Sequence, residues 1–156
     1  MKVLPIDQLL ARHPFFADLA PDDARFVAGC GVNRVVGADD FVFRAGDQAD
    51  QFFVVRSGQV AVELYAPGRG PLILETVGAG AVLDPAWLVP PHRWQFDARA
   101  VTVVRLVALD AACLRARCEE HPALGYRLMQ RTAVILQGRL EAARVRLLDL
   151  YGGDRG

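Results

Sequence analysis

The sequence predicts an α+β protein in which short N-terminal helices, an antiparallel β-barrel and a long C-terminal helix follow one another. Short runs rich in Val, Phe and Leu fill the middle of the chain, separated by glycine-containing turns at intervals of about ten residues. This spacing favours a barrel or sandwich over parallel βαβ units. On either side of these runs the apolar residues recur with the period of a helix.

The chain has 156 residues, a length that suits one domain with a substantial buried core. We therefore expect a single domain over residues 1–156. It would have helices in residues 1–31, the barrel in residues 32–109 and two further helices in residues 110–151.

The N-terminal region has clear signals for a helix start. Pro21 suits the first turn of a helix, and Asp22 and Asp23 complement the positive end of the helix dipole. Gly29 and Gly31 mark the end of this helix.

Six runs in the middle of the chain have the composition of strands. They are residues 32–36, 40–44, 51–58, 59–66, 71–78 and 100–110. Each is short and dominated by β-branched, aromatic or other apolar residues, which is typical of strands on a buried sheet face.

Two helices are predicted after the last of these strands. Asp110 can cap the first, over residues 111–120, and His121-Pro122 begins a second, longer helix. We expect the arginines of the long helix to form a solvated face or to pair with Glu141 and Asp149. These arginines are Arg127, Arg131, Arg139, Arg144 and Arg146.

The second half of the long helix carries a coiled-coil pattern. Its apolar residues alternate between spacings of four and three, as at a and d positions: Leu136, Leu140, Ala143, Leu147 and Leu150. We expect the first half of the helix to pack on its own barrel. The second half extends beyond what a small barrel can cover, which favours a homodimer through this seam over packing on the same chain.

The overall composition limits the class of protein. The net charge is zero, so the chain lacks a general basic field for nucleic acid. No apolar run reaches the roughly 18 residues of a membrane span, and the N-terminus lacks the apolar core of a signal peptide. We therefore expect a cytoplasmic protein without membrane contact.

The cysteines and histidines are too few and too scattered for a metal centre or a disulfide framework. They are Cys30, Cys113, Cys118, His13, His92 and His121. The sequence indicates no Ser-His-Asp constellation either. We expect neither an enzyme nor a bound cofactor.

The stretch VLDPAWLVPPHRWQFDARA, residues 82–100, stands out among the simple strands. It holds both tryptophans, three prolines, a histidine and two arginines. A segment this rigid, aromatic and polar between strands indicates a ligand site.

The order of these elements and two stretches of sequence resemble the cyclic nucleotide-binding domain superfamily. The stretches are FRAGDQADQFFVVRSGQVAVEL and VVRLVALDAACLRARCEEHPALGYRLMQR. The superfamily includes the sensor domains of catabolite activator and fumarate–nitrate regulators and the regulatory subunits of protein kinase A. The resemblance covers about residues 5–150 and implies a jelly-roll barrel. Gly46 and Gly58 stand at its turn glycines, where a positive φ is needed.

Residues 82–97 take the position of the superfamily's phosphate-binding cassette, in which a Glu binds the ribose and an Arg binds the cyclic phosphate. Here Asp84-Pro85 stands in place of Gly-Glu, and Trp94 stands in place of the Arg, with Arg93 beside it. Pro85 offers no acceptor and no N–H, and Asp84 would repel an anion. Two lost charge-assisted hydrogen bonds would cost about 3–6 kcal/mol, or about two to four decades in Kd. The resemblance therefore implies a short bacterial member with degenerate cyclic nucleotide binding.

The other polar and aromatic residues of this region have alternative roles. Trp87 and Trp94 could stack on a planar ligand or fill the pocket as core. His92, at an expected loop tip, could contact an anion or be an exposed polar residue. Asp97 and Arg99 lie on one face of a strand, where they could pair with each other or line the site.

Two classes of function agree with these features. One is a stand-alone ligand-sensing regulatory module that acts through dimerisation or a partner protein. The other is an interaction or scaffold module with a filled pocket. A genuine cyclic nucleotide binder that uses Arg93 and His92 is a further alternative. Because no helix-turn-helix can be placed after the long helix, we expect no direct DNA binding by this chain.

Overall fold

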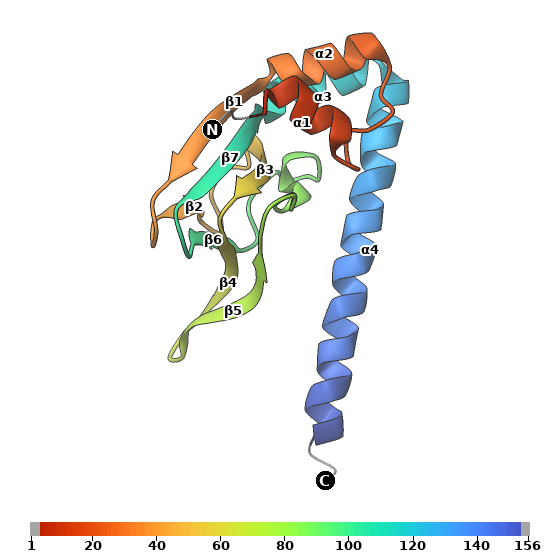
Figure 1. The fold of residues 1–156 in the computed structure, drawn as a ribbon. Coiled ribbons are helices and arrows are strands. Elements are labelled where there is room, and N and C mark those ends of the chain that lie inside the picture. Colours follow the sequence, from red (N-terminus) through yellow and green to blue (C-terminus); the bar gives the residue numbers. More distant parts are fainter. Residues whose placement is uncertain (1–3, 154–156) are drawn as a thin grey trace.

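The computed structural model of the protein describes residues 4–153 and shows a β-barrel with helices at one end and along one side (Figure 1). The helices are α1 (Ile6–Arg12), α2 (Pro21–Gly29), α3 (Ala111–Glu120) and α4 (Pro122–Gly153), with a 3-10 helix η1 at Pro85–Trp87. The strands are β1 (Gly31–Val36), β2 (Phe41–Phe43), β3 (Gln51–Ser57), β4 (Val60–Ala66), β5 (Gly70–Val77), β6 (Asp97–Ala100) and β7 (Val104–Asp110). The outermost parts of the expected domain, residues 1–3 and 154–156, lie outside the described residues.

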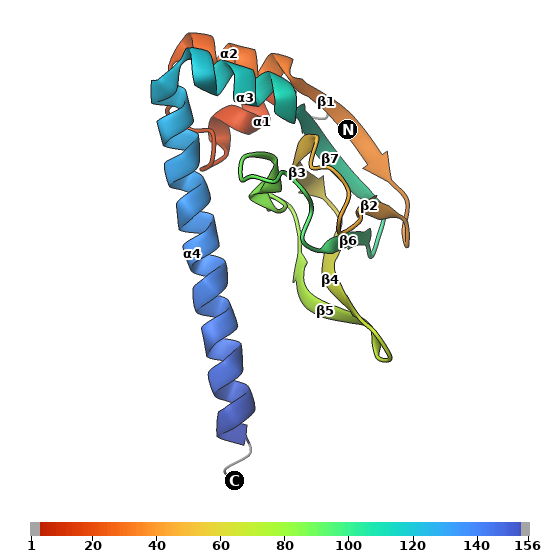
Figure 2. The same ribbon diagram turned by 180° about the vertical axis from the view of Figure 1, so that it is seen from behind.

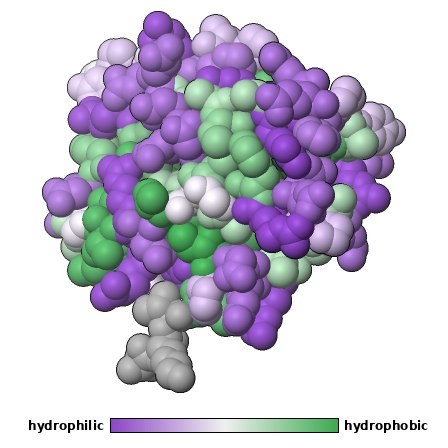
Figure 3. Space-filling model, turned by 90° about the horizontal axis from the view of Figure 1, so that it is seen from above, coloured by the Kyte–Doolittle hydropathy of each residue, from purple (hydrophilic) through white to green (hydrophobic). Residues whose placement is uncertain are grey.

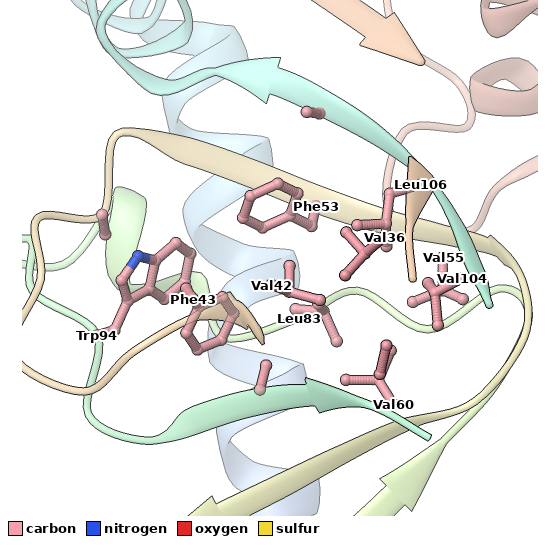
Figure 4. Packing of buried hydrophobic residues seen from close by; sticks show 14 of the residues in the cluster. Val36, Val42, Phe43, Phe53, Val55, Val60, Leu83, Trp94, Val104 and Leu106 are labelled. Atoms are coloured by element: carbon pink, nitrogen blue, oxygen red, sulfur yellow. The ribbon is translucent and has the colours of Figure 1, made fainter. Parts of the chain in front are cut away.

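The strands form two antiparallel sheets, in the orders β1–β7–β3 and β2–β6–β4–β5. The first core lies between them, where Val36 and Leu106 from one sheet face Val42 and Val60 from the other (Figure 4). This arrangement confirms the predicted α+β fold, an antiparallel jelly-roll with helices before it and a long helix after it.

One strand prediction is wrong, because residues 100–110 do not form a continuous strand. β6 ends at Ala100 in the four-stranded sheet, and β7 begins at Val104 in the three-stranded sheet. The crossing between the sheets is tight, since a Cβ at Gly58 would lie 2.3 Å from the carbonyl oxygen of Val103. Gly58 also has a φ of 92°, a conformation that other residues rarely adopt. The crossing residues contain no glycine, proline or asparagine, so the sequence carried no signal for the turn.

A second core lies under α1, α2 and α3, which gather at one end of the barrel (Figures 1 and 2). It joins apolar residues from the helices to the outer face of the three-stranded sheet, among them Leu10, Phe15, Phe16, Val27, Phe52, Val54, Leu109 and Leu114. Seen from this end, hydrophilic residues cover most of the surface and surround hydrophobic residues near the middle of the view (Figure 3).

The predicted helix starts are confirmed. Pro21 is the first residue of α2, and Pro122 is the first residue of α4. Asp110 caps α3, because its carboxylate accepts a hydrogen bond of 2.8 Å from the backbone N–H of Cys113.

α4 runs from the helical end along the barrel towards the β4–β5 hairpin (Figures 1 and 2). In its first half, Leu124 and Leu128 are buried in the second core, as predicted. Residues 140–152 are exposed. No helix in the described part of the chain is both long and apolar enough to cross a membrane.

The arginines of α4 differ from the expectation of a solvated face. Arg144 pairs with Glu141 at 3.8 Å, but four others donate to backbone carbonyls of the body of the protein. Arg127 donates to Asp18, Arg131 to Phe15 and Ala17, Arg139 to Val82, and Arg146 to Leu74. A guanidinium can reach carbonyls of loops and of a strand that no sequence spacing reveals. These contacts attach both halves of α4 to the rest of the chain.

Candidate functional site

The first half of the cassette, residues 82–97, turns through η1 beneath the helical end. Pro85 is the first residue of η1, which suits its missing N–H. The indole of Trp87 is fully buried in the second core, with its ring centroid 5.0 Å from that of Phe52. Arg115 donates to the carbonyl of Trp87 at 2.7 Å and so ties this turn to α3.

The second half of the cassette places Trp94 in the other core, between the two sheets. Its ring stacks on Phe43, with the centroids 3.8 Å apart and the planes within 9° (Figure 4). The side chain is only 3% exposed. Trp87 and Trp94 therefore occupy separate cores as packed rings, and they do not line one aromatic pocket.

Residues 92–94 lie against the turn at residues 46–49. The backbone N–H of Gly46 donates to the carbonyl of Trp94, and the N–H of Trp94 donates to the carbonyl of Asp47. Gly46 has a φ of 89°. Because neighbouring residues of an extended segment point to opposite faces, Arg93 points away from the Trp94 ring. The Arg93 guanidinium donates to the carbonyl of Gly46 at 2.8 Å. His92 adjoins it in a left-handed conformation with a φ of 59°.

Asp97 and Arg99 do not form the ion pair considered from the sequence. The Asp97 carboxylate accepts from the backbone N–H of Ala45 at 2.7 Å. Arg99 pairs with the buried Glu63 at 2.5 Å and with Asp39 at 3.2 Å. A neighbouring strand lies closer than a residue two positions along the same strand, which is why the cross-strand partners prevail. Arg99 therefore joins β6 to β4, and Asp97 joins β6 to the turn that follows β2.

A cavity of about 440 Å³ lies between the four-stranded sheet, the cassette and the second half of α4. Its apolar lining comprises Phe43, Val62, Leu74, Phe96, Ala142, Ala143, Leu147 and Leu150. Its charged lining comprises Glu75, Asp84, Arg139 and Arg146. Asp84 is the cassette candidate that faces this cavity, and three residues of the expected dimer seam form its opposite wall.

Two smaller hollows hold other candidates. One of about 240 Å³ lies between the cassette and Leu136, and Asp84, Pro85 and Arg93 line it. Another of about 350 Å³ opens on the far side of Trp94 and is mostly polar, with Asp47 among its lining residues. Within the described residues, no group of three or more His, Cys, Asp or Glu could hold a metal ion.

The electrostatics of the 440 Å³ cavity depend on which charges already have partners. Arg139 donates to the carbonyl of Val82 at 3.0 Å and lies 3.9 Å from Glu75. Arg146 donates to the carbonyl of Leu74. The two cations therefore hold α4 against the barrel.

Asp84 is the charged group of the cavity in which one oxygen atom lacks a partner. Its Oδ2 atom is buried and accepts no hydrogen bond from any residue that the structure describes. Burial raises the pKa of Asp84, although Arg139 and the backbone N–H groups of Gln95 and Ala86 oppose the rise. The Oδ2 atom of this carboxylate can still accept from a hydrogen-bond donor, and the negative charge repels an anion.

Sequence reasoning missed that α4 covers the cassette, and with it the roles of Glu75, Phe96 and Arg139. One signal was available. Ala142 and Ala143 are adjacent small residues in a helix otherwise rich in Leu and Arg. Small side chains on a helix face leave a cavity unless the neighbouring element moves closer to the helix.

Two of the cysteines are not scattered in space. The sulfur atoms of Cys30 and Cys113 lie 2.7 Å apart, and both residues are free thiols. Burial, together with the neighbouring thiol, raises the pKa of Cys30 to about 12. This pair joins the end of α2 to the start of α3, and it lies away from the cavity.

Comparison with known proteins gives the chain its relatives. The model of the cyclic nucleotide-binding domain family matches residues 33–121, more than half of the chain. A CRP-like cAMP-activated global transcriptional regulator of Mycobacterium tuberculosis is 25% identical over 154 residues, covering 96% of this chain and 65% of the regulator. The chain spans between 30% and 65% of the length of the curated relatives that it matches.

Two solved structures share the fold. A Geobacter metallireducens protein named as a cyclic nucleotide-binding protein is 25% identical, with a TM-score of 0.77 over 88% of this chain and 99% of its own. The catabolite activator protein of Thermus thermophilus is also 25% identical, with a TM-score of 0.68 over 89% of this chain and 63% of its own. The family match, the jelly-roll and the cassette between strands agree, and the chain belongs to the cyclic nucleotide-binding domain family.

Proposed function

We propose that this protein is a ligand-sensing regulatory module in which α4 closes a small-molecule cavity on the barrel and transmits its occupancy. One observation carries the proposal. Ala143, Leu147 and Leu150 line the cavity and also belong to the apolar seam of α4. A ligand in the cavity would therefore touch the segment through which a second copy or a partner protein is expected to bind. The module acts by binding and not by catalysis.

The attachment of α4 supports this role. Over its second half, Arg139 and Arg146 hold the helix to the barrel through backbone carbonyls. Such contacts are geometrically specific but individually modest, at about 1.5–3 kcal/mol each for a charged donor. The second half of α4 can therefore shift when the cavity beneath it fills, whereas Leu128 keeps the first half in the core.

The seam of α4 supports dimerisation as the output. Tyr126, Met129 and Ala133 continue its alternating spacing towards the start of the helix, and all three are exposed. The complete seam comprises Tyr126, Met129, Ala133, Leu136, Leu140, Ala143, Leu147 and Leu150. An apolar a/d row of this length on an exposed helix is typical of a two-stranded coiled coil.

Sedimentation equilibrium tests the dimer. We expect twice the monomer mass at tens of micromolar protein, and we expect Leu140→Glu to yield monomers because it places a charge in the seam. Leu148→Glu is the matched control, since Leu148 is 70% exposed and lies outside the seam. A monomeric wild type would contradict the dimer, and equal dissociation by both variants would contradict the seam as its interface.

We further propose that cyclic AMP and cyclic GMP bind weakly, with Kd values of at least about a hundred micromolar. Trp94 is packed against Phe43 and offers no cation, Pro85 offers neither acceptor nor N–H, and Asp84 would face the phosphate. Titration calorimetry on the wild type tests this. Low-micromolar binding that Arg93→Gln abolishes would instead support the alternative in which Arg93 holds the phosphate.

The packed rings of Trp87 and Trp94 favour one competing function, a scaffold module that only dimerises. The two functions differ in what α4 does when the cavity is occupied. In the sensing module, occupancy changes amide hydrogen exchange in residues 139–150. In the scaffold module, exchange in that segment stays constant whichever small molecule is added.

A further inference from the structure

We infer that the cavity between the barrel and α4 takes an apolar ligand that carries a hydrogen-bond donor and no negative charge, with the donor at Asp84. This inference rests on the proposed function, because it names the class of ligand that the sensing module would bind. It departs from an anionic ligand such as a cyclic nucleotide.

The walls of the cavity set the apolar character. Eight of its twelve lining residues are apolar, including Phe43 and Phe96 on the barrel side and Leu147 on α4. A volume of about 440 Å³ lies in the range of small-molecule sites. Burying an apolar ligand there gains about 25 cal/mol for each Å² of apolar surface removed from water.

The cations of the cavity already hold contacts that fix α4. The Arg139 guanidinium already has the carbonyl of Val82 and the carboxylate of Glu75. Arg146 already has the carbonyl of Leu74. An anionic ligand that drew either guanidinium towards itself would compete with these contacts, which also hold α4 in place.

Asp84 sets the polar specificity. Its Oδ2 atom is buried without a hydrogen-bond partner among residues 4–153. A buried acceptor without a partner is unfavourable, and a donor on the ligand would relieve this cost. A negative charge at the same place would add like-charge repulsion in a site of low polarity.

A matched pair of fluorescent probes tests the inference. N-phenyl-1-naphthylamine is uncharged and apolar and carries one N–H, whereas 8-anilinonaphthalene-1-sulfonate has the same ring skeleton with a sulfonate. On the wild-type protein at neutral pH, we expect one uncharged probe per chain, bound at least about tenfold tighter than the sulfonate. Equal or tighter binding of the sulfonate would overturn the inference. So would binding of neither probe, because the cavity would then be filled in solution.

Two substitutions on α4 locate the probe. Ala142 lines the cavity, and Ala142→Trp should abolish binding of the uncharged probe. Val145 is 48% exposed and is absent from the cavity lining, so Val145→Trp adds the same bulk to the same helix and should leave binding unchanged. Retained binding in Ala142→Trp would place the probe elsewhere and overturn the inference.

Asp84→Asn tests the polar specificity directly. The amide removes the negative charge and keeps an acceptor, so we expect the preference for the uncharged probe to fall to within about threefold. An unchanged preference would remove Asp84 from the explanation and overturn the inference. Circular dichroism of each variant verifies that it is folded.

The outcomes separate this inference from the proposed function. If the uncharged probe binds as expected but amide exchange in residues 139–150 does not change, sensing fails and the ligand class stands. If the sulfonate binds equally well and exchange in that segment slows, sensing stands and the ligand class fails.

Discussion

In its first half α4 is part of the hydrophobic core, whereas in its second half it stands over a cavity. Leu124 and Leu128 are 2% and 0% exposed, but residues 140–152 are exposed throughout. Arginines hold both halves to backbone carbonyls, so hydrogen bonding is not what separates them. The difference is that apolar side chains of the other helices and the three-stranded sheet pack against the first half of α4.

This contrast shows how one unbroken helix can combine a fixed end with a movable one. In the first half Leu128 faces the second core directly. In the second half Ala142 and Ala143 face Val62 and Leu74 across the cavity. On this face of α4, a large side chain in the first half fills the core. Small side chains in the second half leave a space that a ligand can occupy.

The largest expected effect is on stability in the first half of α4. Leu128→Ala should lower the free energy of unfolding by about 3 kcal/mol, because it leaves a cavity in a packed core. Leu148→Ala in the second half should lower it by less than about 0.5 kcal/mol, since Leu148 is 70% exposed. Urea unfolding of both variants measures the contrast. Similar losses for the two would contradict the division of α4 into a core half and an exposed half.

The arginine contacts should follow the same division with smaller effects. Arg131→Met removes hydrogen bonds to the carbonyls of Phe15 and Ala17 beside the core, and we expect it to cost about 2 kcal/mol. Arg139→Met should cost less than about 1 kcal/mol, because the helix there can move away without unfolding the core. Urea unfolding gives both values. A larger loss for Arg139→Met would show that the second half is as firmly fixed as the first.

The smallest expected effect is the pH dependence of protein stability that arises from Asp84. Burial raises the pKa of Asp84 in the folded state, so the folded protein holds this proton more tightly than the unfolded chain. Asp84 therefore lowers stability as pH rises through its unfolded pKa, and its full cost is present above its folded pKa. Glu75, Arg93, Arg139 and Arg146 are the other charged groups that line the two cavities around it.

Asp84→Asn should accordingly raise the free energy of unfolding at neutral pH, and the gain should vanish near pH 3. Urea unfolding at the two pH values measures it. A gain that persisted at the lower pH would show that ionisation of Asp84 is not its source.

The sequence was sufficient for most of the fold because local signals agreed with one another. Pro21 and Pro122 begin helices, Asp110 caps a third, and the glycine turns separate the strands. The break between β6 and β7 could not be predicted, because it depends on the space beside Gly58 and not on any residue of the turn.

The site was less predictable because it is made by tertiary contacts. That Asp84 is unfavourable to an anion stays a prediction; the structure places this residue in the lining of the cavity, with its buried Oδ2 atom lacking a hydrogen-bond partner among the described residues. That Trp87 and Trp94 belong to different cores follows from the direction of each side chain on an irregular loop. The contact of Arg139 with a carbonyl has no counterpart in a sequence pattern.

Amide hydrogen exchange along α4, with and without N-phenyl-1-naphthylamine, tests most directly whether the second half of the helix senses the cavity. The account predicts that the bound probe slows exchange at least about tenfold in residues 139–150 and leaves residues 122–132 unchanged. Equal slowing in both halves, or no change in residues 139–150 at saturating probe, would contradict it.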